Sequence, residues 1–269
     1  METERKVAEA RRILRELGSA LVAYSGGVDS TLLLKLAHDE LGERALPVYI
    51  SSPTMVGWEK DEALAQAREI GATVRIVAGE ELCNPEFVAN TPLRCYHCRA
   101  TNYRPLQRIA DAEGLAAIVD GANRDDLDDY RPGRRAAAEK GVRSPLLEAG
   151  LTKAEVRAAS RALGLSSWNK PSMPCLASRI PYGIPVTEEA LRRIEQAESA
   201  LHELGFGELR VRHHGEVARI EVPPADFPRL LERREAVVQR LKAAGYAYVT
   251  LDLQGFRSGS LNETLSAAS

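Results

Sequence analysis

Residues 25–30, Ser-Gly-Gly-Val-Asp-Ser, are the part of this chain whose residue types and spacing best suit chemistry. They follow a short apolar run and precede an amphipathic one, so we expect a buried strand that turns through glycine into a helix. Gly26 and Gly27 can both adopt positive φ and direct successive N–H groups into one concavity. The helix N-terminus adds partial positive charge, and the hydroxyl groups of Ser25 and Ser30 add donors. The segment is therefore predicted to bind pyrophosphate.

Two other phosphate-binding motifs fit this segment less well. A Walker P-loop would continue into Gly-Lys-Ser/Thr, and a dinucleotide-binding motif would contain a third glycine; neither is present. The alternative of a simple tight turn is disfavoured by the two serines, by Asp29 and by the expected strand–helix context.

A second group of polar residues follows the strand expected at 116–120. Asp120 ends this strand, and Asn123, Asp125 and Asp126 come within the next few residues. Carboxylates that converge on a phosphate site repel the phosphate unless a cation such as Mg²⁺ neutralises them. We therefore expect this turn to belong to a site for Mg²⁺ and a phosphate ligand. The alternative interpretation is a solvated acidic turn.

The cysteines form a third candidate group. Cys95 and Cys98 make a Cys-x-x-Cys pair, Cys175 lies in a proline-rich segment, and Cys83 is interpreted as an incidental thiol. Cytoplasmic cysteines stay reduced, which favours metal binding or catalysis over disulfides. Three cysteines suit an iron–sulfur cluster with one iron left open. Zinc bound by the same three cysteines and His97 is the alternative.

Arginines at two places could bind anionic groups. Three of them follow the acidic turn: Arg131, Arg134 and Arg135. Arg210 and Arg212 lie two residues apart on an expected strand, so they share one of its faces. Like charges placed this way repel unless an anion or an acid pairs with them. For Arg210 and Arg212 the two interpretations are binding of a phosphate of a nucleotide substrate and a salt bridge to Glu221 or to a neighbouring subunit.

Strands and helices alternate over the part of the chain that carries these groups. We expect strands at 20–24, 46–50, 73–77 and 116–120, and helices at 4–17, 29–41, 57–70, 99–113 and 153–163. Such alternation is typical of βαβ units with a parallel sheet, whose ligands bind beyond the carboxyl ends of the strands. The 25–30 segment and Asp120 both follow strand ends and should meet at that edge.

The pattern changes after residue 165. Four prolines in 166–186 predict an ordered loop without regular structure. Helices are then expected at 188–203 and 226–243, and strands at 208–213, 217–222 and 246–253. The sequence thus predicts an α/β domain with a parallel sheet over 1–184 and a smaller α+β domain over 185–269.

Composition restricts the possible partners. The 269 residues are 44% hydrophobic and carry a net charge of −2, so no strongly basic surface for nucleic acid is expected. No apolar run approaches the roughly 18 residues of a membrane-spanning helix. The charged N-terminal residues lack the apolar core of a signal peptide. We expect a cytoplasmic protein with a small-molecule substrate and neither nucleic acid nor a membrane as partner.

Five segments together resemble the LarE-type ATP-dependent sulfur transferases. They are 25–30, 120–126, 130–133, 174–179 with 181–183, and 255–259. The first resembles the PP-loop of N-type ATP pyrophosphatases, and the Pro-Cys-Leu-Ala-Ser-Arg sequence of 174–179 is more specific to the family. The resemblance extends over residues 5–263 and implies a PP-loop domain of the adenine nucleotide alpha hydrolase type.

The resemblance implies a reaction in two steps. A carboxylate of pyridinium-3,5-biscarboxylic acid mononucleotide attacks the α-phosphate of Mg·ATP, and pyrophosphate leaves into the 25–30 loop. A sulfur nucleophile then displaces AMP, which yields the thiocarboxylates of the nickel-pincer nucleotide. By match to the motif, Cys175 is the sulfur centre. The resemblance also implies that Arg179, Arg210 and Arg212 bind the phosphate or carboxylate groups of the substrate.

The family has two forms that differ in their sulfur source. In the single-cysteine form the cysteine gives up its own sulfur and becomes dehydroalanine. In the three-cysteine form a [4Fe-4S] cluster, here on Cys95, Cys98 and Cys175, carries an extra sulfide and permits repeated turnover. The Cys-x-x-Cys pair favours the second form, with sacrifice of Cys175 as the alternative. A tRNA thiolation enzyme of the same superfamily is a further alternative, which the net charge disfavours. Members of the family assemble as homo-oligomers, often hexamers.

Overall fold

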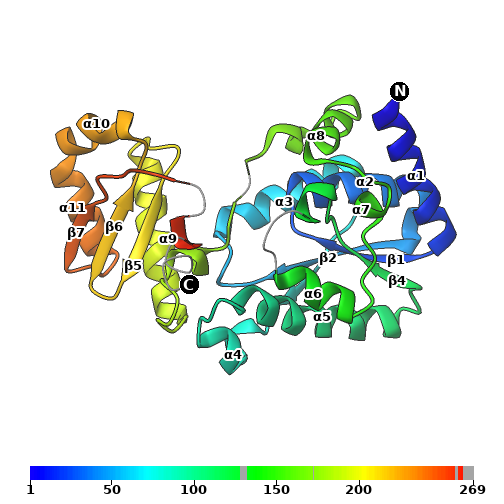
Figure 1. Ribbon diagram of the computed structural model, residues 1–269, viewed down its shortest axis with the longest axis horizontal. Coiled ribbons are helices and arrows are strands. Elements are labelled where there is room, and N and C mark those ends of the chain that lie inside the picture. Colours follow the sequence, from blue (N-terminus) through cyan, green and yellow to red (C-terminus); the bar gives the residue numbers. More distant parts are fainter. Residues whose placement is uncertain (128–131, 172, 258–259, 263–269) are drawn as a thin grey trace. The chain divides into compact units, whose positions relative to one another are not determined.

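The computed structural model describes residues 1–127, 132–171, 173–257 and 260–262. The chain forms two compact units, 1–87 with 93–173 and 88–92 with 174–269 (Figure 1). The second unit therefore includes residues 174–184, which the sequence-based division assigns to the first domain. Backbone hydrogen bonds explain this, because Val186 N donates to Val88 O at 2.9 Å and Gly183 N donates to Asn90 O at 3.1 Å.

A parallel four-stranded sheet forms the centre of the first unit (Figure 1), which confirms the predicted α/β class. Its strands are β1 (Ala20–Tyr24), β2 (Ala45–Ser51), β3 (Arg75–Ala78) and β4 (Ala117–Val119). They lie in the order β3-β2-β1-β4. β1 lies in the interior of the sheet and is apolar on both faces, because helices cover both sides of a parallel sheet.

Helices pack on the two faces of this sheet. One face is covered by α1 (Glu2–Leu17), α2 (Val28–Leu41), α3 (Gly57–Ile70), α7 (Pro145–Glu148) and α8 (Lys153–Ala162). The other is covered by α5 (Arg94–Ala112) and α6 (Pro132–Glu139). A single turn, α4 (Pro85–Val88), precedes α5. The short helices α6 and α7 carry too few periodic apolar residues to be expected from the sequence.

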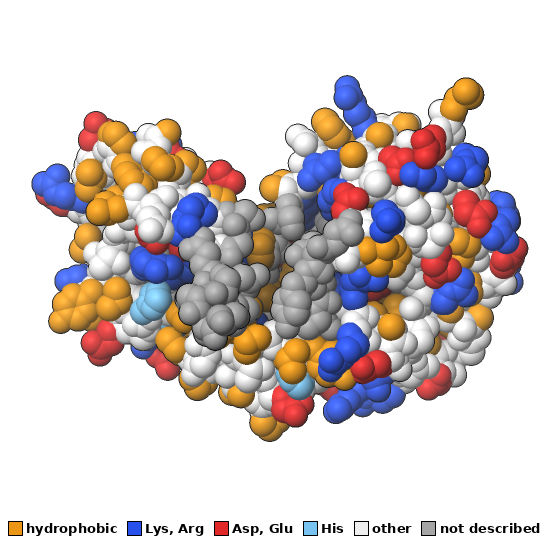
Figure 2. Space-filling model, viewed as in Figure 1, with side chains coloured by type: hydrophobic (Ala, Val, Ile, Leu, Met, Phe, Trp, Pro, Cys, Tyr) orange, Lys and Arg blue, Asp and Glu red, His pale blue; other side chains and the backbone are white. Residues whose placement is uncertain are grey.

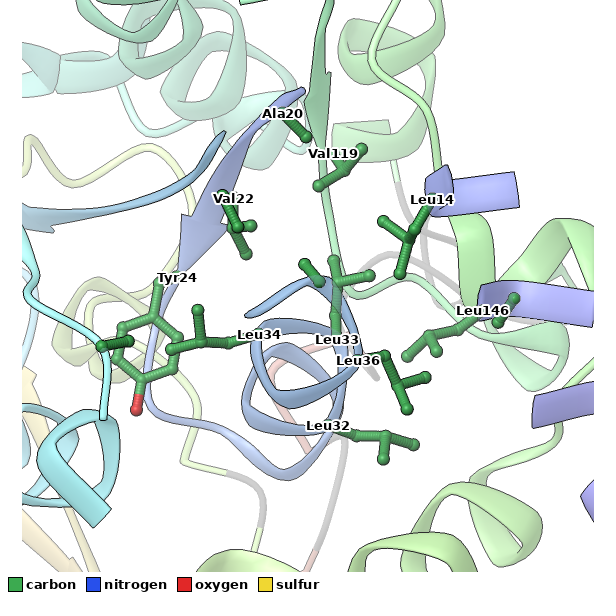
Figure 3. Close-up of a cluster of buried hydrophobic side chains, with 14 of the residues drawn as sticks. Leu14, Ala20, Val22, Tyr24, Leu32, Leu33, Leu34, Leu36, Val119 and Leu146 are labelled. Carbon is green, nitrogen blue, oxygen red and sulfur yellow. The ribbon is translucent and has the colours of Figure 1, made fainter. Parts of the chain in front are cut away.

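The leucines of α2 form much of the core in the first unit. Leu32, Leu33, Leu34 and Leu36 are fully buried. They extend toward side chains of β1, β4, α1 and α7 (Figure 3). Burial of one leucine side chain contributes about 1.5–3 kcal/mol to stability. A helix held on several sides in this way is a rigid support for the loop that precedes it.

The second unit contains a three-stranded mixed sheet. β5 (Arg210–His214) pairs antiparallel with β6 (Val217–Glu221), and β6 pairs parallel with β7 (Tyr248–Leu251). The helices of this unit are α9 (Glu188–Glu203), α10 (Phe227–Glu232) and α11 (Arg234–Ala243). The single helix predicted at 226–243 is therefore wrong, because the chain breaks helical geometry at Arg233. Apolar side chains of α9, β5, β6 and α11 form the core.

The start of α5 differs from the prediction in a way that bears on function. A helix is predicted from residue 99, but α5 begins at Arg94, so Cys95 and Cys98 lie in its first two turns. Cys, Tyr and His are weak helix formers, which hid this turn from the sequence pattern. The described residues of 166–186 form only the short 3₁₀ turns Ser166–Asn169 and Leu176–Arg179, as their prolines predict.

On the face seen in Figure 2, basic and acidic side chains are interspersed over the first unit, and no large field of one sign covers it. Among the described residues, no helix is long and apolar enough to cross a membrane.

Candidate active site

Gly26 holds the 25–30 loop against α3. Its φ is 71°, in the left-handed region that glycine favours. A β-carbon at Gly26 would overlap the Cβ of Ala63 and lie 2.9 Å from the Ala63 Cα. Gly27 has a φ of −79° and is the N-cap residue of α2. Positive φ at Gly27 is therefore not needed, because a single left-handed residue already turns the chain.

The loop presents a row of backbone donors. The N–H groups of residues 26–30 donate no hydrogen bond to any group in the described part of the chain. The hydroxyl of Ser30 closes the loop from inside, since its Oγ lies 3.0 Å from Ser25 Oγ and donates to Gly27 O at 3.1 Å. Unsatisfied N–H groups at a helix N-terminus, with the partial positive charge of the helix, suit a phosphate group.

The turn after β4 lies directly against this loop, as the shared sheet edge predicts. A β-carbon at Gly121 would lie 2.8 Å from Ser30 N and 2.9 Å from the carbonyl carbon of Asp29. Glycine at this position therefore permits the two backbones to approach. The 25–30 segment and the polar turn 120–126 do lie in contact with one another.

Asp120 acts as an anchor within this site. Four donors occupy its carboxylate: Oδ2 accepts from Arg99 Nη1 at 3.2 Å and Tyr103 OH at 3.1 Å, and Oδ1 accepts from Ser144 Oγ at 2.6 Å and Ala122 N at 3.2 Å. Burial raises the pKa of Tyr103 above its ordinary value, so its phenol keeps the proton that it donates. A carboxylate has about four lone-pair positions. All are used at Asp120, which disfavours it as a metal ligand.

The remaining polar residues form a network around Asp29. Asn123 Nδ2 donates to Asp29 Oδ1 at 3.1 Å, and the Lys153 ammonium pairs with Asp29 Oδ2. Asp125 Oδ2 accepts from Lys153 N at 3.0 Å, and Asp126 Oδ2 accepts from Asn123 N at 2.9 Å. Of these carboxylates, Asp29 is the one within the loop itself.

Two lysines lie at the loop that the sequence pattern does not predict there. Lys153 is 124 residues away from Asp29 in the sequence, and Lys170, whose Nζ donates to Gly26 O at 3.3 Å, is 144 residues away from Gly26. No spacing rule connects residues so far apart. The one available signal was local, because the capping box at Thr152 places Lys153 at the start of a helix.

All four cysteines are free thiols, three in the first unit and one in the second. Cys95 and Cys98 lie one turn apart on the same face of α5, and Cys98 Sγ accepts from Asn102 Nδ2 at 3.7 Å. His97 points elsewhere, with Nδ1 2.8 Å from Glu86 Oε2, which disfavours the zinc set that includes it. Cys175 belongs to the second unit. Within the described residues, no three Cys, His, Asp or Glu side chains are arranged to hold a metal ion.

Arg179 organises the backbone around Cys175. It is only 3% exposed and forms a two-pronged ion pair with Glu198, both N–O distances being 2.9 Å. Its Nη1 also donates to Pro174 O at 2.6 Å and to Cys175 O at 3.3 Å. These contacts assign Arg179 to the support of the Cys175 segment.

Arg212 is also committed to an internal pair. Its guanidinium contacts Glu221 at 2.9 and 3.0 Å and donates to Ser178 O at 2.7 Å. The salt-bridge interpretation therefore holds for Arg212, and the glutamate is the one considered from the sequence.

Arg210 is different from its two neighbours. Within the described chain its guanidinium has no acid or hydrogen-bond partner and lies over the ring of Phe256, 4.9 Å from the centroid. Burial and the charges of Arg179 and Arg212 lower the pKa of Arg210. A buried cation that is repelled by two others gains most from a bound anion.

The other predicted arginines and motifs are only partly described. Arg134 Nη1 donates to Asp126 O at 3.0 Å, and Arg135 Nε lies 3.2 Å from Glu139 Oε1. Tyr130 and Arg131, like residues 258–259, lie outside the described residues.

The chain matches no protein-family model, but it has extensive similarity to known proteins. An uncharacterised protein of Synechocystis is 45% identical over 265 residues, 98% of this chain and 99% of that protein. The pyridinium-3,5-bisthiocarboxylic acid mononucleotide synthase of Lactiplantibacillus plantarum is 41% identical over 256 residues, 95% of this chain and 93% of that synthase. The chain belongs to this synthase family, the LarE family.

The chain also has weaker similarity to a second kind of synthase. A subunit of the glutamine-hydrolysing GMP synthase of Archaeoglobus fulgidus is 27% identical over 219 residues, 76% of this chain and 71% of that relative. Both kinds of relative are named as synthases, so we assign the chain to the enzymes. The resemblance read from the five segments is confirmed at the level of the LarE family.

Proposed function

We propose that the chain is an ATP-dependent sulfur transferase. It would adenylate the carboxylates of pyridinium-3,5-biscarboxylic acid mononucleotide and convert them to thiocarboxylates for the nickel-pincer nucleotide. The observation that carries this proposal is the 41% identity to the L. plantarum synthase over 95% of the chain. The donor-lined loop at 25–30 and the unpaired charge of Arg210 support it, because both reactants are anionic nucleotides.

In the first step, a substrate carboxylate oxygen attacks the α-phosphorus of ATP. The bond to the bridging oxygen breaks, pyrophosphate leaves, and an acyl-adenylate remains. The N–H groups of residues 26–30 would take up the charge on pyrophosphate. Asp29, the carboxylate within the loop, would hold the Mg²⁺ that enters with ATP, since Mg²⁺ needs only one or two protein carboxylates beside phosphate oxygens.

In the second step, sulfur replaces AMP on the activated carbonyl carbon. If Cys175 is the donor, its thiolate forms a thioester and AMP leaves. Loss of the Cα proton and cleavage of the Cβ–S bond then leave dehydroalanine and release the thiocarboxylate. Arg179 would hold the Cys175 backbone in place during this reaction, through the carbonyl oxygens of Pro174 and Cys175.

The alternative that we favour keeps Cys175 intact as a cluster ligand. Cys95 and Cys98, one turn apart at the start of α5, and Cys175 provide three thiolates, a donor set of the right chemistry for a [4Fe-4S] cluster. A bound cluster would supply an exchangeable sulfide, so that turnover need not consume the protein.

The adenylation step is tested by ATP–pyrophosphate exchange. Labelled pyrophosphate should enter ATP only when the biscarboxylic nucleotide is present, because exchange requires the acyl-adenylate. The variant Cys175→Ala should keep this exchange and lose thiocarboxylate formation. Exchange that is absent from the wild type, or product formation that survives in Cys175→Ala, would contradict the proposal.

The sulfur source is tested by anaerobic purification with iron and sulfide counts and by intact mass after turnover. Cluster use predicts iron and sulfide in the protein and an unchanged mass, and sacrifice predicts a protein lighter by one H₂S. Cys95→Ala should lose the iron, whereas Cys83→Ala is the matched control that should keep it. We also propose that the protein forms a homo-oligomer, a hexamer by resemblance to the family. Light scattering would measure its mass in solution.

A further inference from the structure

A buried ammonium group lies beside the 25–30 loop and has no role in the reaction as described above. Lys170 Nζ donates to Gly26 O at 3.3 Å, and the side chain is only 9% exposed. Lysine side chains are seldom buried to this extent. Hydrogen bonds also fix its backbone, since Lys170 N donates to Ser167 O at 2.9 Å and Arg157 Nη2 donates to Lys170 O at 3.0 Å. The fold therefore places this charge at the loop.

The carboxylate that balances this charge comes from α3. Glu62 Oε2 lies 3.0 Å from Lys170 Nζ, and Glu62 Oε1 accepts from Gln66 Nε2 at 3.3 Å. Gln66 Oε1 in turn accepts from Thr31 Oγ1 at 3.3 Å. Polar contacts thus run from Gly26, at one end of the loop, through α3 to the first turn of α2. The lysine and its partner are part of the loop's support.

Glu62 is a weak partner for this lysine. Its side chain is 41% exposed, and ion pairs with a solvated carboxylate contribute little to stability. A phosphate group carries more negative charge than a carboxylate and offers more acceptor oxygens. A phosphate bound at the N–H groups of the loop would therefore compete well with Glu62 for the Lys170 ammonium.

We propose that Lys170 binds a phosphate group of ATP, and that Glu62 holds the lysine in place until the nucleotide enters. This inference rests on the proposed function, since it requires ATP to bind at the 25–30 loop. It makes Lys170 a substrate-binding residue and Glu62 a positioning residue that competes with the substrate. The competition gives the two residues opposite effects on nucleotide affinity.

The variants Lys170→Met and Glu62→Gln break the same ion pair and so form a matched test. Isothermal titration calorimetry should show that Lys170→Met weakens the binding of Mg·ATP and of inorganic pyrophosphate about ten- to a hundredfold, the range of a charge-assisted hydrogen bond. Glu62→Gln should bind both ligands as tightly as the wild type or more tightly. Lys35→Met, which breaks the Lys35–Asp39 pair of α2, controls for the loss of one positive charge.

Trp58 offers a second readout that needs no turnover. Its ring centroid lies 5.9 Å from Lys170 Nζ, so movement of the ammonium should change its emission. In a Trp168→Phe background, pyrophosphate should alter Trp58 fluorescence in the wild-type loop and not in Lys170→Met. Melting temperatures of each variant verify that it is folded.

The outcomes separate this inference from the proposed function. Equal ligand affinity in the wild type and Lys170→Met would overturn the inference alone, as would a loss in Glu62→Gln as large as that in Lys170→Met. A wild-type protein that binds neither Mg·ATP nor pyrophosphate would overturn both.

Discussion

Gly26 and Ala63 are in such close contact that no β-carbon fits between them. The β-carbon of any other residue at 26 would overlap the Ala63 Cβ, and the φ of 71° disfavours other residues as well. Tyr24 OH donates to Ala63 O at 2.9 Å and ties the end of β1 to the same turn of α3. The shape of the candidate pyrophosphate loop thus depends on a helix that lies outside it in sequence.

This contact predicts different results for the two adjacent glycines. Gly26→Ala should lower the free energy of unfolding by about 1–3 kcal/mol, since strain and overlap add, and should abolish ATP–pyrophosphate exchange. Gly27→Ala is the control, because its φ is −79° and the nearest atom to a new β-carbon is Ser25 Oγ at 3.5 Å. Urea denaturation and exchange assays measure both effects. Equal losses in the two variants would contradict this account.

Substitution of Asp120 should mainly reduce stability, whereas substitution of Asp29 should mainly reduce activity. Asp120→Asn leaves the buried Tyr103 and the exposed Arg99 without a charged acceptor, and should cost about 1.5–3 kcal/mol of stability. Asp29→Asn should cost less than about 1 kcal/mol, because its pair with Lys153 is partly exposed, but should abolish Mg-dependent exchange. Chemical denaturation and exchange at several Mg²⁺ concentrations provide the comparison. A stable, inactive Asp120→Asn would show that Asp120 is a ligand after all.

Arg210 is expected to reduce stability in the absence of ligand. Arg210→Met removes a buried charge that Arg179 and Arg212 repel, so it should raise the free energy of unfolding by about 1 kcal/mol or more while weakening substrate binding. Phosphate should raise the melting temperature of the wild type and have less effect on Arg210→Met.

A neighbouring arginine serves as the control for this experiment. Arg212→Met leaves the buried Glu221 with only the partly exposed Arg219 as an ion-pair partner, and should cost up to about 3–5 kcal/mol. A lower free energy of unfolding in Arg210→Met than in the wild type would contradict the proposal that Arg210 binds an anion.

Stability of the second unit should fall as pH falls through the histidine range. Burial, followed by the charges of Arg193 and His214, lowers the pKa of His213 below its ordinary value of 6.5. Below pH 6.5 the unfolded chain takes up a proton that the folded unit does not. The free energy of unfolding is therefore highest above pH 6.5 and decreases on acidification. The slope contributed by one group cannot exceed about 1.4 kcal/mol per pH unit.

This pH dependence can be assigned with one variant. In His213→Asn the fall in melting temperature between pH 8 and pH 5.5, roughly the range over which histidine titrates, should be smaller than in the wild type. An identical fall in the variant would assign the effect to other groups. His213 Nδ1 lies 3.2 Å from Tyr246 OH in the core, and Asn can keep a hydrogen bond to that hydroxyl.

Local chemistry made part of the site predictable. Two glycines and two serines between a strand and a helix are typical of a phosphate loop, and strands alternating with helices are typical of a parallel sheet whose carboxyl edge collects the loops. The approach of residues 120–126 to the 25–30 loop followed from that geometry. The extra turn at the start of α5 did not, because tertiary context overrides the weak helix preference of the residues around Cys95.

The sequence by itself determined the chemical groups that this protein carries: a donor-lined loop, a turn of carboxylates, three cysteines and paired arginines. Only the tertiary structure decided how those groups are used. Glu198 and Glu221 neutralise Arg179 and Arg212 and leave Arg210 for an anion, and Lys153 and Lys170 reach the loop from 124 and 144 residues away. The physical reason is that the charge of a buried group is set by its neighbours in space, and sequence spacing does not reveal neighbours that folding alone brings together.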